Sequence, residues 1–215
     1  MALKNTFFTA AILLNGLFCS VSWADDVADL SAKLQALNTF SAHFEQRLLD
    51  DSGAELQKTE GLVKVSNPGR FFWQVEPPFE QTVVTDGEQL WVYDPDMEQV
   101  TVYSKQQLAS TPAQLLSGDF AELAKTYTIT ASINASINKG ALTYRMAPKN
   151  EQTSNFSGLE FVFDKKDRLA GMTLEDKLGQ RTVVTFSKRQ FNKPIDATIF
   201  SFKPPAGTDV IHSGS

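Results

Sequence analysis

Residues 61–103 read GLVKVSNPGRFFWQVEPPFEQTVVTDGEQLWVYDPDMEQVTVY, and this stretch decides the fold. Its apolar side chains alternate with polar ones, which places them on one face of successive β-strands. The alternating positions include Phe71, Trp73, Val75, Leu90 and Val92. Between the runs stand Asn67-Pro68-Gly69 and Asp86-Gly87, whose residue types supply the backbone angles of reverse turns. The stretch therefore predicts an antiparallel meander with large aromatic side chains on its faces.

The same alternation continues on both sides of this meander. One run before it includes Phe44, and a later run includes Phe161 and Phe163. The runs outside or overlapping the meander are 40–48, 56–66, 127–133, 142–146, 159–163, 169–174 and 182–186. With the meander they predict a mainly β protein of about ten or eleven strands, and a sheet of that size has to curl. A curled sheet that its side chains fill incompletely encloses an apolar cavity, whereas a filled, ordinary β-core is the other explanation of the aromatic residues.

Two segments are predicted to be helical. Asp25 or Asp26 can cap a first helix that ends near Asn38 and has leucines at helical spacing. Thr111-Pro112-Ala113-Gln114 combines a capping box with proline at the first helical position. The helical pieces of residues 111–125 are short and apolar on one side, so they are expected to cover the sheet.

The N-terminal residues have the pattern of a secretory signal peptide. Lys4 precedes the apolar run 7–18, which is too short to span a bilayer, and Ser22-Trp23-Ala24 fits a cleavage site. We expect residues 1–24 to be removed and residues 25–215 to form one domain. A lipid-modified cysteine needs a small residue before it, but Phe18 precedes Cys19, so Cys19 is expected to leave with the signal peptide.

Charge and motifs argue against several classes of function. The formal net charge is −5 with no cluster of basic residues, which disfavours nucleic acid and anionic membrane surfaces as partners. The chain has two histidines, His43 and His212, and no Gly-x-Ser-x-Gly or phosphate-binding glycine motif. Asp94, Asp96 and Glu98 alternate, but the glycine of a calcium loop does not follow them. We therefore predict no enzyme activity, no metal and no cofactor.

Several motifs, in this order, resemble one known family. They are Phe44-Glu45-Gln46, Pro68-Gly69-Arg70-Phe71-Phe72-Trp73, Thr85-Asp86-Gly87, Leu90-Trp91-Val92-Tyr93-Asp94-Pro95, Glu98-Gln99-Val100, Thr111-Pro112 and Phe202-Lys203-Pro204-Pro205-Ala206-Gly207. In order and spacing they resemble the periplasmic outer-membrane lipoprotein carrier proteins (LolA), over essentially the whole chain after the signal peptide. The related outer-membrane receptor shares the fold but is itself a lipoprotein, and Phe18 before Cys19 argues against that identity.

The resemblance implies an unclosed (half) antiparallel β-barrel with a helical lid over an apolar cavity. It implies a monomeric periplasmic chaperone that takes acylated lipoproteins from an inner-membrane lipoprotein-releasing ABC transporter and delivers them to an outer-membrane lipoprotein receptor. The residues expected to line the lipid-binding cavity are Phe44, Phe71, Trp73, Val75, Leu90, Val92, Leu115, Leu116, Phe120, Leu123, Phe161 and Phe163.

One position departs from the family pattern. Family members often have a basic residue, thought to tie the sheet to the lid, just before the proline that matches Pro68, and here that residue is Asn67. Arg47 and Arg70 are the candidates for the lid latch. A lipid-binding or lipoprotein-sensing envelope module and a lipid-acting enzyme are the two alternative functions.

Overall fold

The computed structural model describes residues 23–104, 116, 123–134, 141–150, 152, 154 and 156–213. The strands are β1 (Thr39–Leu49), β2 (Glu55–Ser66), β3 (Arg70–Val75), β4 (Gln81–Thr85), β5 (Gln89–Asp94), β6 (Gln99–Ser104), β7 (Tyr127–Asn134), β8 (Ala141–Pro148), β9 (Phe156–Phe163), β10 (Leu169–Asp176), β11 (Arg181–Phe191) and β12 (Asp209–His212). The helices are α1 (Trp23–Gln35), α4 (Leu123–Thr126) and the 3-10 helix η2 (Ala197–Phe200).

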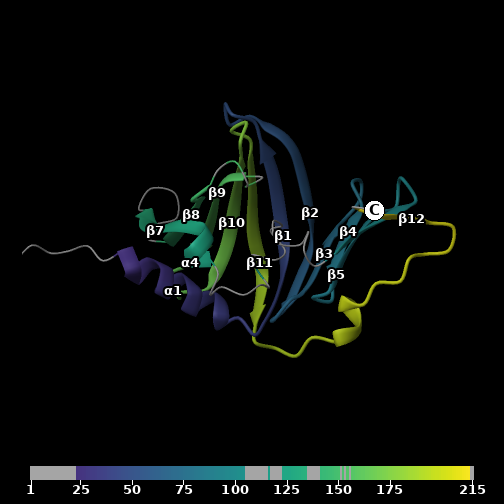
Figure 1. The fold of residues 1–215 in the computed structure, drawn as a ribbon, viewed down its shortest axis with the longest axis horizontal. Coiled ribbons are helices and arrows are strands. Elements are labelled where there is room, and N and C mark those ends of the chain that lie inside the picture. The colour runs from purple at the N-terminus through teal and green to yellow at the C-terminus, as the bar shows by residue number, and fades with distance from the viewer. Residues whose placement is uncertain are drawn as a thin grey trace, which may run out of the picture.

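The twelve strands of the described residues belong to one sheet, in the order β12-β6-β5-β4-β3-β2-β1-β11-β10-β9-β8-β7. The chain makes two antiparallel meanders, β1 to β6 and β7 to β11, and the pairing of β1 with β11 joins them. Figure 1 shows the strands fanning around an arch, with β7 at one end and β12 at the other. Because β7 and β12 do not pair, the sheet stays open, which confirms the expected mainly β, unclosed antiparallel architecture.

The predicted number of ten or eleven strands was too low. The strand that sequence reasoning missed is β12, which follows Pro204-Pro205 and pairs in parallel with β6. Its four residues are too few for an alternation to stand out, and its partner lies far away in the sequence. The first helix also begins earlier than expected, at Trp23 rather than after Asp25 or Asp26.

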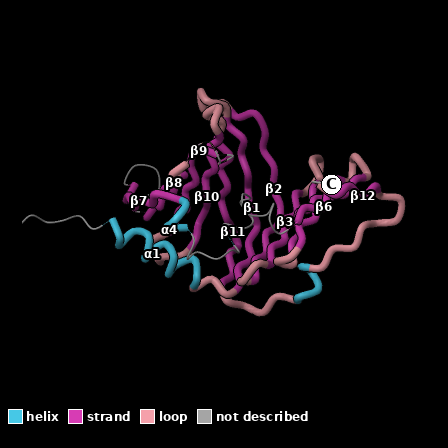
Figure 2. The backbone as a smooth tube through the Cα atoms, viewed as in Figure 1, coloured by secondary structure: helices cyan, strands magenta, loops and turns pink. Residues whose placement is uncertain are grey.

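One face of the sheet, here called the inner face, carries the hydrophobic core. The pairs Phe40–Val65, Ala42–Val63 and Phe44–Gly61 of β1 and β2 lie on it, and so do their neighbours on adjacent strands. Leu30 and Leu34 of α1 are fully buried in this core. Figure 2 shows α1 and α4 at the β7–β8 end of the sheet, so the helix covers only part of the inner face.

Polar contacts fasten α1 to the sheet. The Asp26 carboxylate accepts a hydrogen bond from the backbone N–H of Ala131 in β7, at 2.8 Å. The hydroxyl of Tyr144 in β8 donates to the Asp29 carboxylate. Tyr144 is fully buried, and this burial, followed by the contact with Asp29, raises the pKa of the Tyr144 hydroxyl. Tyr144 therefore remains protonated at neutral pH and can keep donating this bond.

The opposite face, here called the outer face, is covered at one end by the C-terminal segment. Phe200 of η2 is buried, and the guanidinium of Arg70 lies 5.6 Å from the centre of its ring. The Phe202 ring lies 6.5 Å from that of Trp91 and 5.7 Å from that of Tyr93. These contacts form a second, smaller core over β3 to β6, and β12 continues from it along β6.

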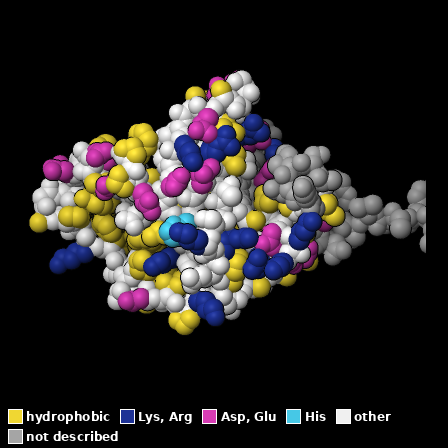
Figure 3. All heavy atoms as spheres, turned by 180° about the vertical axis from the view of Figure 1, so that it is seen from behind, with side chains coloured by type: hydrophobic (Ala, Val, Ile, Leu, Met, Phe, Trp, Pro, Cys, Tyr) yellow, Lys and Arg dark blue, Asp and Glu magenta, His cyan; other side chains and the backbone are white. Residues whose placement is uncertain are grey.

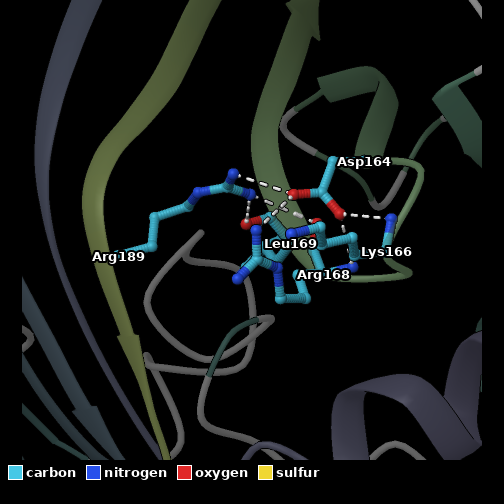
Figure 4. Close-up of polar contacts among 5 residues, drawn as sticks. All are labelled: Asp164, Lys166, Arg168, Leu169 and Arg189. Atoms are coloured by element: carbon cyan, nitrogen blue, oxygen red, sulfur yellow. Dashed lines mark hydrogen bonds and ion pairs between the residues drawn. The ribbon is translucent and has the colours of Figure 1, made fainter.

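The turn between β9 and β10 is built around Asp164. Its carboxylate accepts hydrogen bonds from the backbone N–H groups of Lys166 and Arg168, at 2.8 and 3.2 Å, and from the Arg189 guanidinium at 2.8 Å (Figure 4). Burial alone would raise the pKa of Asp164, but these hydrogen bonds outweigh burial and lower the pKa below its usual value. Arg189 also donates to the carbonyl of Leu169 at 2.8 Å, so one arginine joins β11 to this turn.

Candidate functional site

An aromatic stack on the inner face is the centre of the candidate site. The Phe44 ring of β1 stacks on the Trp73 indole of β3, with centroids 3.7 Å apart and planes inclined by 18°. The Phe71 ring continues the same row, with its centroid 6.1 Å from that of Trp73. The strand between Phe44 and Trp73 is β2, which has Gly61 opposite Phe44. Since Gly61 has no side chain, the Phe44 ring can lie across β2 and reach Trp73.

The register of the strands carries this apolar surface towards β6. Phe71 lies opposite Thr85, which lies opposite Leu90. In the next row Trp73 lies opposite Val83, which lies opposite Val92. Leu90 is buried and Val92 is half-buried. The structure therefore places all the predicted cavity residues of β1, β3 and β5 on one face.

The predicted residues of the other meander belong to the same core. Phe161 and Phe163 of β9 are both buried in it, together with Phe44, Phe71 and Val75. Trp73 is half-buried and packs against this core. The core also includes inner-face residues that the sequence-based site did not name: Val63, Val65, Tyr144, Met146, Leu159, Met172, Val184 and Phe186. Their strand alternation was the signal that could have identified them.

The predicted lid falls mostly outside the described residues. Leu115 and Phe120 lie outside them, and Leu123 is described only as the first residue of α4. Leu116 is helical and 2% exposed, and it is part of the hydrophobic core. Among the described residues of the segment 111–125, Leu116 thus meets the core, and the lid itself stays a prediction.

The two latch candidates make other contacts. Arg70 donates to the Ser66 hydroxyl at 2.9 Å and stacks on Phe200 on the outer face. Arg47 forms an ion pair with Glu55 at 2.6 Å, and both side chains are largely exposed. Their role as a latch stays a prediction.

Asn67, at the position that is often basic in the family, joins the β2–β3 turn to the end of α1. Its side-chain amide donates to the carbonyl of Leu37, and its backbone N–H donates to the carbonyl of Asn38 at 2.9 Å. Sequence reasoning missed this link, because the Asn67 partners are backbone carbonyl groups, which no residue type announces.

A hollow of about 470 Å³ lies on the outer face of β8 to β11, away from the aromatic stack. Arg145 crosses it and forms ion pairs with Glu160 and Glu175, both at 2.9 Å. The guanidinium passes over Gly158, where a Cβ atom would come within 2.9 Å of it. Because charged groups line this hollow, it does not suit an acyl chain.

Among the described residues, no group of three or more His, Cys, Asp or Glu side chains is placed to hold a metal ion. In the same part of the chain, no helix is long and apolar enough to cross a bilayer. Figure 3, the view from behind, shows Lys and Arg side chains across the middle of this side of the molecule, with Asp and Glu side chains mostly above them and hydrophobic ones gathered at one end.

Comparisons with known proteins agree on one family. Residues 35–203 match the family model described as outer membrane lipoprotein carrier protein LolA. An outer-membrane lipoprotein carrier protein of Alcanivorax borkumensis is 41% identical over 211 residues, which cover 97% of this chain and 98% of that protein. A protein of the same name from Pseudomonas aeruginosa is 36% identical over 215 residues, which cover 98% and 99%.

Among solved structures, an uncharacterized conserved protein from Thermus thermophilus superposes with a TM-score of 0.55. The match covers 89% of this chain and 99% of that one at 12% identity, so it concerns the fold alone. The architecture is an open, curled sheet, antiparallel except for the pairing of β12 with β6, with the larger hydrophobic core on its inner face and α1 packed into that core. With the family match over residues 35–203, the chain belongs to the family of outer-membrane lipoprotein carrier proteins, LolA.

Proposed function

We propose that this protein is a periplasmic chaperone that carries acylated lipoproteins to the outer membrane. The observation that carries the proposal is the continuous apolar inner face around Phe44, Trp73 and Phe71, in a chain that belongs to the lipoprotein carrier family. In this proposal the acyl chains of the cargo lie against that face. Residues 1–24 are removed on secretion, and residues 25–215 act as one monomeric domain.

The energetics require a cover that can move. Burying apolar surface gains about 25 cal/mol per Å², so two or three acyl chains in a rigid, complementary pocket would be held too tightly to deliver. We propose that residues 111–125 close over the inner face as a lid and open for exchange. Leu115, Leu116, Phe120 and Leu123 then provide the apolar surface of the lid.

The proposed partners follow from the same family. An inner-membrane lipoprotein-releasing ABC transporter loads the carrier, and an outer-membrane lipoprotein receptor unloads it. The net charge of −5 keeps the carrier away from anionic lipid surfaces, which favours transfer through protein contacts. The acylated protein passes from the transporter to the carrier and from the carrier to the receptor. This transfer needs neither a chemical reaction nor a cofactor.

The two indoles on opposite faces make a direct test possible. Trp73 lies on the inner face, whereas Trp91 lies on the outer face beside Phe202. Trp23 belongs to the removed residues 1–24, so in residues 25–215 the variants Trp91→Phe and Trp73→Phe each leave one indole as the fluorophore. A synthetic lipopeptide with bromine-labelled acyl chains is the probe, because bromine quenches only indoles that it contacts.

We expect strong quenching of Trp73 and little quenching of Trp91. Quenching of Trp91 alone would place the acyl chains on the outer face. Failure to quench either indole, at probe concentrations that a matched unlabelled lipopeptide shows to saturate binding, would remove the inner face as the acyl site. If no lipopeptide binds, the proposed carrier function is wrong.

A further inference from the structure

A polar pair lies at one end of the apolar part of the inner face. Gln46 of β1 and Thr59 of β2 lie directly opposite each other in the register. They stand two residues along the strands from Phe44 and Gly61, so both side chains are on the inner face beside the aromatic stack. On the other side, Gln46 lies opposite Val184 of β11, which is 5% exposed and belongs to the core. Two residues further along the same face, Leu48 lies opposite Gln57 and Thr182, so the two hydrogen-bonding side chains lie where the apolar surface ends.

The Thr59 hydroxyl has no hydrogen-bond partner in the folded chain. Thr59 is 8% exposed, and its Oγ1 atom is buried and makes no hydrogen bond. Within the described part of the chain, no hydrogen bond of the Gln46 amide is found either. A buried hydroxyl without a partner destabilises the protein that contains it, and a polar ligand that supplies the partner recovers this loss.

The chemistry of the pair selects one kind of polar group. A hydroxyl and a carboxamide can both donate hydrogen bonds, and an ester or amide carbonyl oxygen accepts them. An acyl chain consists of apolar methylene groups except at the carbonyl that links it to the rest of the molecule. That carbonyl is the one polar group that must be buried when the whole chain enters an apolar site.

We propose that Thr59 and Gln46 bind the carbonyl groups through which the acyl chains are joined to the cargo. This inference rests on the proposed carrier function. It identifies the chemical group of the cargo that the site binds through directional hydrogen bonds. The Thr59 hydroxyl donates to one carbonyl oxygen, and the Gln46 amide donates to that oxygen or to a neighbouring one. The apolar residues then bind the chains only through the burial of apolar surface. The polar pair determines how far along the inner face the chains lie.

The test uses two synthetic lipopeptides of equal chain length. In the first, two acyl chains are joined by ester bonds, and in the second, two alkyl chains are joined by ether bonds, which lack carbonyl groups. Both are titrated into the wild-type protein and into Thr59→Val and Gln46→Leu. The matched control is Thr185→Val, because Thr185 is exposed and lies on the outer face.

We expect Thr59→Val to bind the ester lipopeptide about fivefold more weakly, the size of one lost hydrogen bond, and the ether lipopeptide with less than about a twofold change. Gln46→Leu should also weaken binding of the ester lipopeptide more than binding of the ether lipopeptide. Thr185→Val should change neither affinity. Thr59→Val should also melt at the same temperature as the wild type or higher, since a partnerless buried hydroxyl has been removed. Thr59→Ser retains the hydroxyl and should retain the preference for the ester.

The outcomes separate the two proposals. If the wild type binds neither lipopeptide, the carrier function fails. If it binds both and Thr59→Val weakens them equally, or weakens neither, the carbonyl site is wrong while the carrier function stands. If Thr59→Val does not fold, Gln46→Leu with the same two lipopeptides decides, and an equal effect on both overturns the inference.

Discussion

The ring of Phe44 occupies the space that a side chain at Gly61 would need. A Cβ atom at residue 61 would come within 2.7 Å of the Phe44 ring and within 1.9 Å of the carbonyl oxygen of Gln74. The absence of one methyl group therefore allows a ring from β1 to cross β2 and stack on Trp73 of β3.

Gly61→Ala should be strongly destabilising, because the added methyl group meets backbone as well as the ring. We expect a loss of about 3 kcal/mol in the free energy of unfolding, measured with urea. Gly158→Ala is the matched control, since its nearest neighbour is the flexible end of Arg145, and it should cost about 1 kcal/mol. Equal losses for the two variants would contradict the packing argument.

Tyr144→Phe should loosen the attachment of α1. The variant removes the hydroxyl that donates to Asp29, and we expect a loss of about 1–2 kcal/mol at neutral pH. Burial and the Asp29 contact raise the pKa of Tyr144 above the value of 10.0 that applies in the unfolded chain. The contribution of the hydroxyl is therefore fully present below pH 10.0 and is lost as the pH rises further.

Unfolding measured from neutral pH to about pH 11 checks this sign. The stability difference between the wild type and Tyr144→Phe should be constant up to about pH 9 and should shrink above about pH 10. A difference that grows with alkaline pH would show that the Tyr144 pKa shifts in the opposite direction.

Asp164→Asn should lower the stability of the fold at neutral pH and leave it unchanged in acid. The hydrogen bonds to the Asp164 carboxylate lower its pKa in the folded state below the usual 3.8. Its charge therefore stabilises the protein above that pH, and this contribution disappears as the pH falls through the folded-state value. We expect Asp164→Asn to lose about 1 kcal/mol at about pH 7, with wild type and variant converging below about pH 3. Parallel pH curves would mean that the Asp164 charge adds nothing.

Phe200→Ala should separate stability from acyl binding. Phe200 is 2% exposed in the outer-face core, so its truncation should cost about 3 kcal/mol. The folded fraction should still bind acyl probes with unchanged affinity, because Phe200 lies on the face opposite Trp73. Phe79→Ala is the control, since Phe79 is 51% exposed and should change stability by less than about 0.5 kcal/mol. A loss of acyl affinity in Phe200→Ala would show that the two faces are coupled.

Strand alternation predicted the inner face well, because each residue in a strand reports its side of the sheet. It separated Leu90 and Val92 from Trp91 and Tyr93, and the structure places Trp91 and Tyr93 on the outer face against Phe202. Alternation has no information about how distant segments meet.

The parallel pairing of β12 with β6 and the contact of Asn67 with Leu37 both depend on such distant meetings. The sequence did not predict that Gly61 makes room for the Phe44 ring, because alternation concerns the side chains that are present. The lid prediction rests on residues of which only Leu116 and the first positions of α4 are described.

The hydrogen bond from Ala131 to Asp26 has a consequence for the protein in a crowded compartment. An open sheet has an edge strand whose N–H groups can recruit a strand from another molecule and start aggregation. At the β7 edge, the Asp26 carboxylate already occupies the Ala131 N–H, and it would repel the carbonyl oxygens of an approaching strand. The residue that attaches α1 thus also hinders another strand from pairing with the β7 edge at this position.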